Sequence, residues 1–199
     1  EFASVLSHDL LNPLNVAEGR LELAQAEFDS EHFPPIERAH TRMRSLIDSM
    51  LTLARDGDDV GELESVPLAS FAEQCWHNVD TQQATIVTPI EQTVQADRSQ
   101  LKQLLENLIR NAVEHGDPEV TMTIGALDNG FFVADDGPGI PPEERGEVFD
   151  LGYSTADDGT GFGLSIVRRI ADAHGWEITV TDGADGGARF EITGVEIVE

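Results

Sequence analysis

Two apolar stripes in the first part of the chain constrain its fold most, because a short segment cannot bury them alone. Residues 1–28 and 36–55 repeat apolar side chains at steps of three and four, which is the period of an amphipathic α-helix. Between them, Pro34 and Pro35 cannot continue the first helix and favour the start of the second. The two helices therefore form an antiparallel hairpin. We expect two copies of the hairpin to bury their stripes in a four-helix bundle; packing of the hairpin against the rest of its own chain is the alternative.

The remaining residues alternate between helical and strand patterns. Residues 57–65 are rich in glycine and acidic residues, so we expect a linker there between a hairpin of residues 1–56 and a domain of residues 66–199. Asp97 begins a helix-capping pattern, and Asp128-Asn129-Gly130 is a strong hairpin signal. Helices on one face of a mixed sheet make a two-layer α/β sandwich. The expected helices cover residues 68–79, 98–115 and 163–175, and the expected strands cover residues 85–87, 93–96, 120–127 and 131–135, with two more strands around 182–187.

Acidic residues dominate the charge of the chain. There are 38 acidic and 12 basic residues, which gives a net charge of −26, and Lys102 is the single lysine. Nucleic-acid binding is disfavoured, because the neutralisation of phosphates requires clustered basic residues. Like charges repel and destabilise a compact protein at low salt, a lever that halophilic proteins use. The acidic excess and the depletion of lysine therefore predict an origin in a high-salt cytosol.

Two further observations bear on the cellular location. No run of residues approaches the roughly 18 to 20 apolar residues that cross a bilayer, and no signal peptide opens the chain. Cys75 is the only cysteine and cannot form an intramolecular disulfide, which fits a reducing cytosol. We therefore expect a cytoplasmic fragment without direct membrane contact. Because no methionine starts the chain, we also expect a longer protein with a membrane-bound portion upstream.

The string Ser7-His8-Asp9-Leu10-Leu11-Asn12-Pro13-Leu14 places a nucleophile next to a base. A neutral imidazole is nucleophilic at one nitrogen when a base accepts the proton of the other, and Asp9 is placed to be the base for His8. Asn12 shares the helical face of both residues. Pro13 bends the helix beside them. A His–Asp pair in a helix is more often a solvated surface, so this pair alone does not establish a catalytic site.

A second group of motifs begins about a hundred residues later. Asn107 and Asn111 lie four residues apart on one helical face, and their carboxamide oxygens are suitable ligands for Mg²⁺ beside phosphates. Asp135 ends a strand and is followed by Gly137 and Gly139, which let the backbone approach a ligand. Each pattern is weak by itself, because asparagine pairs and tight turns are common.

The segment Gly159-Thr160-Gly161-Phe162-Gly163-Leu164 adds a phosphate-binding signal. Its alternating glycines stand directly before a helix and offer backbone amides and a helix N-terminus to a phosphate. A dinucleotide-binding fingerprint has a different glycine spacing and follows the first strand of a βαβ unit. Here the segment follows a loop of roughly twenty residues, and loops of that length are uncommon unless they are functional.

Together the two groups of motifs resemble the catalytic core of sensor histidine kinases, and the resemblance covers nearly the whole chain. It implies a phosphoacceptor hairpin of the HisKA type that dimerises as a four-helix bundle, followed by an ATP-binding α/β sandwich of the GHKL (Bergerat) type. By this resemblance His8 accepts the phosphoryl group of Mg-ATP, Asp9 is the general base, and Asn12 orients water for dephosphorylation of the partner. The implied partners are a second copy of the chain and the receiver domain of a response regulator, whose aspartate takes the phosphoryl group.

The resemblance also implies a nucleotide site. Asn111 is the implied Mg²⁺ ligand, Asn107 an accessory ligand, and Asp135 the acceptor for the adenine amino group. The other residues implied to contact the nucleotide are Arg110, His115, Gly137, Gly139, Ile140, Tyr153, Ser154, Thr155, Thr160, Gly161, Phe162, Gly163 and Leu164.

Some positions depart from the pattern of the family. Leu11 replaces a usual basic residue, and Glu114 and Ala188 stand where many relatives have lysine and threonine. A phosphate site that is short of cations relies on Mg²⁺, on backbone amides and on Arg110 or Lys102.

Two other classes of protein remain as alternatives. Another GHKL ATPase would share the nucleotide site but would lack the preceding hairpin with its histidine string. A degenerate pseudokinase would keep the fold and lose ATP turnover, although the retention of His8, Asp9, Asn111 and Asp135 argues against it. Zinc binding is disfavoured, because the six histidines are scattered and lack ligand spacing.

The net charge predicts a dependence on salt. The Debye length shrinks from about 30 Å at 0.01 M salt to about 3 Å at 1 M, so salt relieves the repulsion between two copies of the chain. We expect a folded, active dimer at about 1 M salt and loosening or dissociation at about 0.1 M, measured by light scattering and circular dichroism. Activity should pass through an optimum, because the same salt screens the attraction of Mg-ATP. A compact, fully active dimer at about 0.05 M salt would rule out the halophilic origin.

Overall fold

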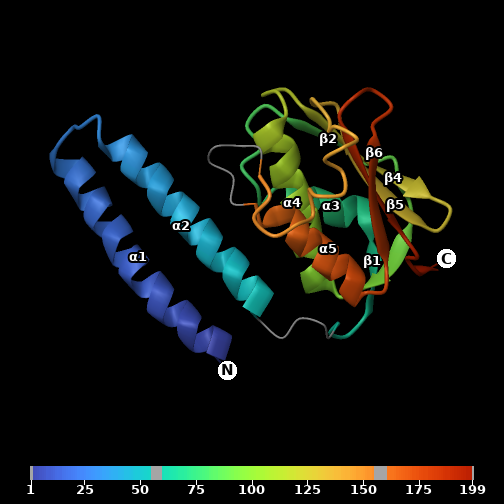
Figure 1. The fold of residues 1–199 in the computed structure, drawn as a ribbon, viewed down its shortest axis with the longest axis horizontal. Helices are drawn as coiled ribbons and strands as arrows, with labels where there is room; N and C mark the ends of the chain where they lie inside the picture. Colours follow the sequence, from blue (N-terminus) through green and yellow to red (C-terminus); the bar gives the residue numbers. More distant parts are fainter. Residues whose placement is uncertain (1, 55–59, 155–160, 199) are drawn as a thin grey trace.

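The computed structural model of the protein describes residues 2–54, 60–154 and 161–198. A helical hairpin precedes an α/β sandwich, as predicted from the sequence (Figure 1). Within these ranges, no helix combines the length and the apolar character that a membrane-spanning helix needs.

The hairpin consists of helix α1, Phe2–Glu27, and helix α2, Phe33–Ala54, which run antiparallel (Figure 1). Helix α2 begins at Phe33 and not at residue 36 as predicted. Pro34 and Pro35 therefore lie in its first turn, where the backbone N–H that proline lacks would have no partner within the helix. The prolines thus form part of the second helix and do not separate the two helices.

Polar contacts join the two helices, while an apolar part of the hairpin surface stays open. Arg44 of α2 donates to Asn15 Oδ1 at 2.6 Å, and its hydrogen-bonded ion pair with Glu18 lowers the pKa of that carboxyl. Nε2 of Gln25 donates to Oε1 of Glu37 at 2.9 Å. Large apolar side chains of both helices and of the loop between them remain exposed: Leu10, Val16, Leu23, Phe28, Ile36 and Met43.

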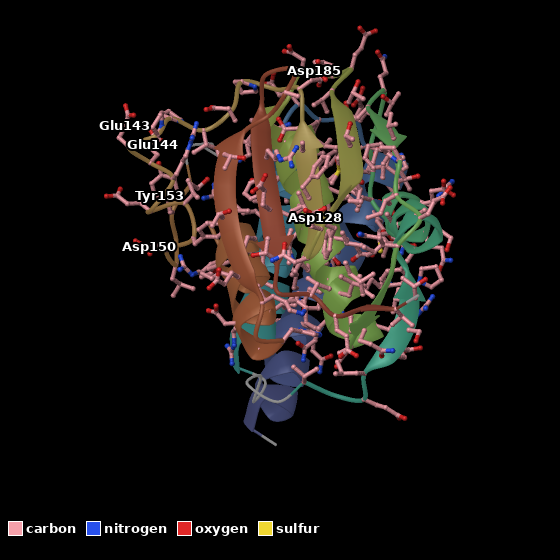
Figure 2. All side chains as sticks on the ribbon, turned by 90° about the vertical axis from the view of Figure 1, so that its right-hand side faces the viewer. Asp128, Glu143, Glu144, Asp150, Tyr153 and Asp185 are labelled. Atoms are coloured by element: carbon pink, nitrogen blue, oxygen red, sulfur yellow. The ribbon has the colours of Figure 1, made fainter. Side chains whose placement is uncertain are left out.

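Three helices and eight strands of the described chain form the α/β part. They are α3 (Leu68–Trp76), α4 (Arg98–His115), α5 (Gly163–Ala173), β1 (Glu64–Pro67), β2 (Thr85–Val87), β3 (Thr93–Ala96), β4 (Thr121–Leu127), β5 (Gly130–Asp135), β6 (Glu177–Asp182), β7 (Ala188–Thr193) and β8 (Ile197–Val198). The larger sheet has the order β2-β4-β5-β7-β6, in which β2 and β4 are parallel and the other neighbours antiparallel. Helices cover one of its faces (Figures 1 and 2), which confirms the two-layer sandwich with a mixed sheet.

Strands β4, β5 and β7 alternate between the covered face and the open face of this sheet, as one-sided burial requires. On the open face, the guanidinium carbon of Arg189 lies 3.7 Å from the centre of the Phe132 ring. That ring covers Gly125, where an added Cβ would lie 2.3 Å from it. The covered face carries the buried side chains of the core, among them Met122, Ile124, Phe131, Val133, Phe190 and Ile192.

A histidine joins the end of α5 to the start of α4. Asp97 caps α4 as predicted, because its Oδ1 accepts hydrogen bonds from the backbone N–H groups of Ser99 at 2.8 Å and Gln100 at 3.1 Å. The backbone N–H of Asp97 donates to Nε2 of His174 at 3.1 Å, so the other ring nitrogen donates to the carbonyl oxygen of Ile170 at 2.8 Å. Burial, offset in part by the Ile170 carbonyl, lowers the pKa of His174.

Two short strands were not predicted. Strand β1 begins at Glu64, within the segment assigned to the linker, and β8 comprises only Ile197–Val198. Both pair with β3, and strands this short show too little alternation to be detected. Helix α3 ends at Trp76 and not at residue 79, because the following residues form turns such as Val79 N–H to Trp76 O at 3.2 Å.

Protonation of His174 should destabilise the protein. Because the pKa of His174 is lower in the folded state, the unfolded state binds more protons, and stability present above about pH 6.5 is lost as the pH falls below it. We expect the unfolding free energy of His174→Gln to lack this loss, whereas His32→Gln, in the exposed hairpin loop, retains it. Denaturant titrations on either side of pH 6.5 measure the difference; matching profiles for wild type and His174→Gln would contradict the assignment.

Candidate functional site

A cavity of about 910 Å³ opens between the sandwich and the hairpin. Its wall comes from α4, the ends of β5 and β7, the start of α5, the loop after β5, and α2. Twelve of the residues that the sequence analysis assigned to the nucleotide lie in this wall: Asn107, Arg110, Asn111, His115, Asp135, Gly139, Ile140, Tyr153, Ser154, Gly161, Gly163 and Leu164.

Other predicted residues lie elsewhere. Gly137 stands beside the cavity and donates its backbone N–H to Asp135, and Phe162 packs against the hydrophobic core at the start of α5. Thr155 and Thr160 lie outside the described residues. Most of the residues predicted to contact the nucleotide are thus brought together around one cavity.

Within the predicted phosphoacceptor string, the described side chains, those of residues 10–14, do not line this cavity. His8 and Asp9 belong to α1, but their side chains lie outside what the structure describes. Asn12, on the same helix, is exposed, and no described side chain of α1 enters the wall. Figure 1 shows α1 on the outer side of α2, away from the sandwich.

Asp135 is held by backbone amides at the end of β5. Its Oδ1 accepts hydrogen bonds from the N–H groups of Gly137 at 3.0 Å and Ala188 at 3.2 Å. Burial raises the pKa of Asp135, and these two amides act against that rise. Because both bonds go to Oδ1, Oδ2 remains available to accept a hydrogen bond from a ligand.

Gly187 shapes this site and was missed by the sequence analysis. Its φ of +72° is unfavourable for other residues, and an added Cβ would lie 2.0 Å from the backbone oxygen of Asp135. A side chain at this position would therefore displace the strand end that carries the carboxylate. The pair Gly186-Gly187 before β7 was a visible signal, but only the fold shows which segment it touches.

The asparagine pair offers carboxamide oxygens to the cavity. Nδ2 of Asn107 donates to the carbonyl oxygen of Gln103 at 2.8 Å, which directs Oδ1 the other way. That oxygen lies 3.5 Å from where a Cβ on Gly163 would be, at the start of α5. Asn111 lines the same wall. Oxygen donors beside a helix N-terminus fit Mg²⁺ bound together with a phosphate, because Mg²⁺ is commonly held by few protein ligands together with phosphates and water.

The described residues do not provide a complete set of protein ligands for a metal ion. They contain no group of three or more histidine, cysteine, aspartate or glutamate side chains arranged to hold a metal ion. A metal at this site would therefore depend on the phosphates of a nucleotide for most of its charged ligands.

The cations expected to assist phosphate binding are engaged with a carboxylate. Nζ of Lys102 lies 3.7 Å from Glu106, and the guanidinium of Arg110 lies 3.6 Å from the same residue. Lys102 is not among the residues of the wall, whereas Arg110 is. Glu114 also lines the cavity, so the sandwich side of the site is acidic.

A backbone hydrogen bond joins Gly152 and Gly161, the two ends of the loop that borders the cavity. The backbone N–H of Gly152 donates to the carbonyl oxygen of Gly161 at 3.0 Å. The φ of Gly161 is +70°, and an added Cβ would lie 2.4 Å from the backbone of Gly152. A side chain at position 161 would therefore push these two ends of the loop apart. The hydroxyl of Tyr153 donates to Oε2 of Glu144 at 2.7 Å, and this bond raises the pKa of Tyr153 to about 12.

Figure 2 shows Tyr153 and Glu144 on the loop that projects beyond one edge of the sheet, with Glu143 and Asp150 nearby. Glu144 was not predicted as a site residue, and no pattern in the sequence marked it. Its contact with Tyr153 fixes the position of that ring at the cavity wall.

Two family descriptions match this chain. Residues 1–58 match the His Kinase A (phospho-acceptor) domain. Residues 96–195 match the histidine kinase-, DNA gyrase B-, and HSP90-like ATPase, which covers the cavity residues of the sandwich.

Curated relatives match both parts at once. The sensor histidine kinase YkoH of Bacillus subtilis is 30% identical over 200 residues, covering 90% of this chain and 44% of the relative. The sensor protein CiaH of Streptococcus pneumoniae is 31% identical over 214 residues, covering 96% of this chain and 48% of the relative. The chain therefore spans about half the length of the curated relatives it matches.

Solved structures agree with these matches. The crystal structure of full-length ShkA in complex with AMPPNP superposes with a TM-score of 0.75 and 28% identity, over 100% of this chain and 46% of that one. The mycobacterial sensor histidine kinase MprB superposes with a TM-score of 0.57 and 26% identity, over 68% of this chain and 97% of that one. The chain therefore belongs to the family of histidine kinase-, DNA gyrase B- and HSP90-like ATPases, and it carries that ATPase domain behind a His Kinase A phospho-acceptor domain.

Proposed function

We propose that this chain is the catalytic core of a two-component sensor histidine kinase that binds Mg-ATP in the cavity and phosphorylates itself at His8. The observation that carries the proposal is the gathering of the predicted nucleotide residues around one cavity of about 910 Å³, in a chain whose first part matches a phospho-acceptor domain. We assign residues 1–56 to dimerisation and phosphotransfer, 57–65 to the linker and 66–199 to ATP binding.

Each end of the cavity has a proposed task. Oδ2 of Asp135 accepts a hydrogen bond from the adenine amino group, since its other oxygen is already held by two amides. Asn111, assisted by Asn107, binds the Mg²⁺ that neutralises charge on the phosphates. The backbone amides at Gly161 and Gly163, with the N-terminus of α5, bind the phosphates themselves.

The remaining predicted residues complete this site. They supply contacts with the base, the sugar and the phosphates from the wall and from the loop that borders it. They are Arg110, His115, Gly137, Gly139, Ile140, Tyr153, Ser154, Thr155, Thr160, Phe162 and Leu164.

The proposed reaction transfers one phosphoryl group. One ring nitrogen of His8 forms a bond to the γ-phosphorus of ATP, the bond from that phosphorus to the bridging oxygen breaks, and ADP leaves. Asp9 accepts a hydrogen bond from the other ring nitrogen and stabilises the charge that develops on the ring. Asn12 serves a later step, in which it orients water for removal of the phosphoryl group from the partner. Positioning and charge neutralisation provide most of the acceleration.

The proposed partners follow from the two domains. The open apolar side chains of the hairpin, such as Val16 and Leu23, are suited to pack against a second copy in a four-helix bundle. The phosphoryl group then passes to an aspartate in the receiver domain of a response regulator. We place the reaction in the cytoplasm, where ATP is supplied, and we attribute the net charge of −26 to a high-salt cytosol.

Substitution of the phosphoacceptor should separate binding from reaction. We expect His8→Gln to abolish labelling by γ-labelled ATP and to leave ATP affinity unchanged, because the imidazole is not needed to bind the nucleotide. The matched control is His77→Gln, an exposed position just after α3, which should retain full labelling. The label should be lost in acid and survive in base, as expected of a phosphohistidine. A label with the opposite stability would identify a different acceptor.

Substitution of Asp135 should change which base is preferred. In Asp135→Asn one oxygen still accepts the two backbone amides, while an amide –NH₂ replaces Oδ2 and faces the adenine amine. Two donors then oppose each other, which costs about 1–3 kcal/mol, so ATP affinity should fall by roughly one to two decades. ITP carries an oxo group in place of the amine and should gain affinity relative to ATP. Competition against a fluorescent nucleotide measures both affinities.

A neighbouring carboxylate provides the control for that experiment. Oδ1 of Asp136 accepts a hydrogen bond from the backbone N–H of Thr121 at 2.7 Å, and Asp136 is not among the cavity residues. Asp136→Asn removes the same charge and should leave the ratio of ATP to ITP affinity unchanged. If Asp135→Asn also left that ratio unchanged, Asp135 would not be the residue that recognises adenine.

A further inference from the structure

One wall of the nucleotide cavity comes from the helical hairpin. Helix α2 contributes Arg38, Thr41, Arg42 and Arg44 to this wall. The same helix contacts α5, whose first residue, Gly163, also lines the cavity. Figure 1 shows α2 as the helix of the hairpin that faces the sandwich. The start of α5, proposed to bind phosphates, and α2 therefore line the same cavity.

The arginines of α2 that line the cavity differ in their contacts with α1. Arg44 is bound to α1, where it donates to Asn15 Oδ1 at 2.6 Å and pairs with Glu18. Arg38 and Arg42 are four residues apart, which places them on a shared side of the helix. Both line the cavity. Arg44 thus joins α2 to α1 and also reaches the cavity wall, whereas Arg38 and Arg42 border the cavity from one shared side of α2.

The sandwich side of the cavity supplies little positive charge. Its described wall includes the carboxylates of Glu106, Glu114, Asp135 and Glu144. Arg110 is the one arginine or lysine that the described part of the sandwich adds to the wall, and it lies 3.6 Å from Glu106. A nucleoside triphosphate adds further negative charge, of which Mg²⁺ neutralises only a part. Cations from outside the sandwich would therefore strengthen binding.

We propose that Arg38 and Arg42 of α2 bind the β- and γ-phosphates of the nucleotide, so that the phosphoacceptor hairpin completes the ATP site. The proposal rests on the proposed function, because it takes the cavity to be the ATP site. A guanidinium group presents a planar set of donors that matches two phosphate oxygens at once. Two such groups on one side of a helix provide the charge that the wall of the sandwich lacks.

The arrangement makes recognition of the phosphates separate from recognition of the base. Adenine binds to Asp135 at the end of β5, whereas the β- and γ-phosphates bind to α2, a helix of the other domain. AMP should therefore bind through the sandwich alone, and the gain in affinity from AMP to ATP should depend on α2. The nucleotide would also connect the two domains, since its base is held by one and its terminal phosphates by the other.

The test compares nucleotides that differ only in phosphate number. We expect the double variant Arg38→Gln/Arg42→Gln of the full chain to bind Mg-ATP at least about tenfold more weakly than wild type, because two charge-assisted contacts are lost. Its affinity for AMP should be unchanged. Isothermal titration with ATP, ADP and AMP measures the three affinities at two salt concentrations, and the salt dependence of ATP binding should become shallower in the variant.

Two further variants separate charge from structure. Arg20→Gln removes an arginine from the exposed surface of α1, outside the cavity, and should leave all three affinities unchanged. Arg38→Lys/Arg42→Lys keeps the charge and should recover part of the ATP affinity, which a purely structural role for the arginines would not predict. Circular dichroism verifies that each variant is folded.

The outcomes distinguish this proposal from the proposed function. Unchanged ATP affinity in Arg38→Gln/Arg42→Gln, together with reduced ATP affinity in Asp135→Asn, would overturn the role of α2 and leave the ATP site in place. Equal loss of ATP and AMP affinity in the double variant would also overturn it, because the arginines would then support the fold of the cavity. No binding of ATP by the wild-type chain would overturn the proposed function itself.

Discussion

The apolar layer between the larger sheet and its helices determines where the functional side chains point. On β5, Phe131 and Val133 are buried in this layer, and the two-residue period of a strand directs Asp135 to the same side. The apolar packing ends with the strand, so Asp135 faces the cavity and not the core. On α4, Asn107 and Asn111 lie beside the buried apolar stripe of the helix. The packing that stabilises the sandwich therefore also positions the side chains of the site.

Much of this arrangement could be predicted, because it follows from patterns that act over a few residues. The cap at Asp97 and the tight connection after Leu127 depend only on neighbouring positions, and both occur as predicted. The asparagine pair on α4 lines one cavity, as its helical spacing allows, and Gly161 and Gly163 stand at the start of α5, as predicted from their place before a helix. The resemblance to sensor kinases supplied what the local patterns lacked, namely the prediction that these separate motifs form one site, and twelve of the predicted residues do line one cavity.

Features that depend on contacts between distant segments could not be predicted in this way. Arg38 and Arg42 belong to a helix whose apolar period indicates only a hairpin, and nothing in that period specifies which side faces the second domain. The need for glycine at position 187 arises from its close approach to Asp135 at the end of β5, which is a contact between distant segments. In contrast, the pairing of Arg110 with Glu106 was predictable, because oppositely charged residues four apart on a helix are neighbours.

The position of α1 outside α2 has a kinetic consequence. An α-helix with its side chains is about 10–12 Å across, so α2 separates the helix that carries His8 from the cavity of the same chain. The proposed phosphoryl transfer to His8 therefore requires the domains to rearrange, or the α1 helix of a second chain to approach. Contacts that stabilise the nucleotide only in the present arrangement lower the energy of the ground state and raise the barrier to reaction. With the proposed contacts from Arg38 and Arg42, turnover would be fastest at an intermediate strength of triphosphate binding, strong enough to bind ATP and weak enough to let α2 move away.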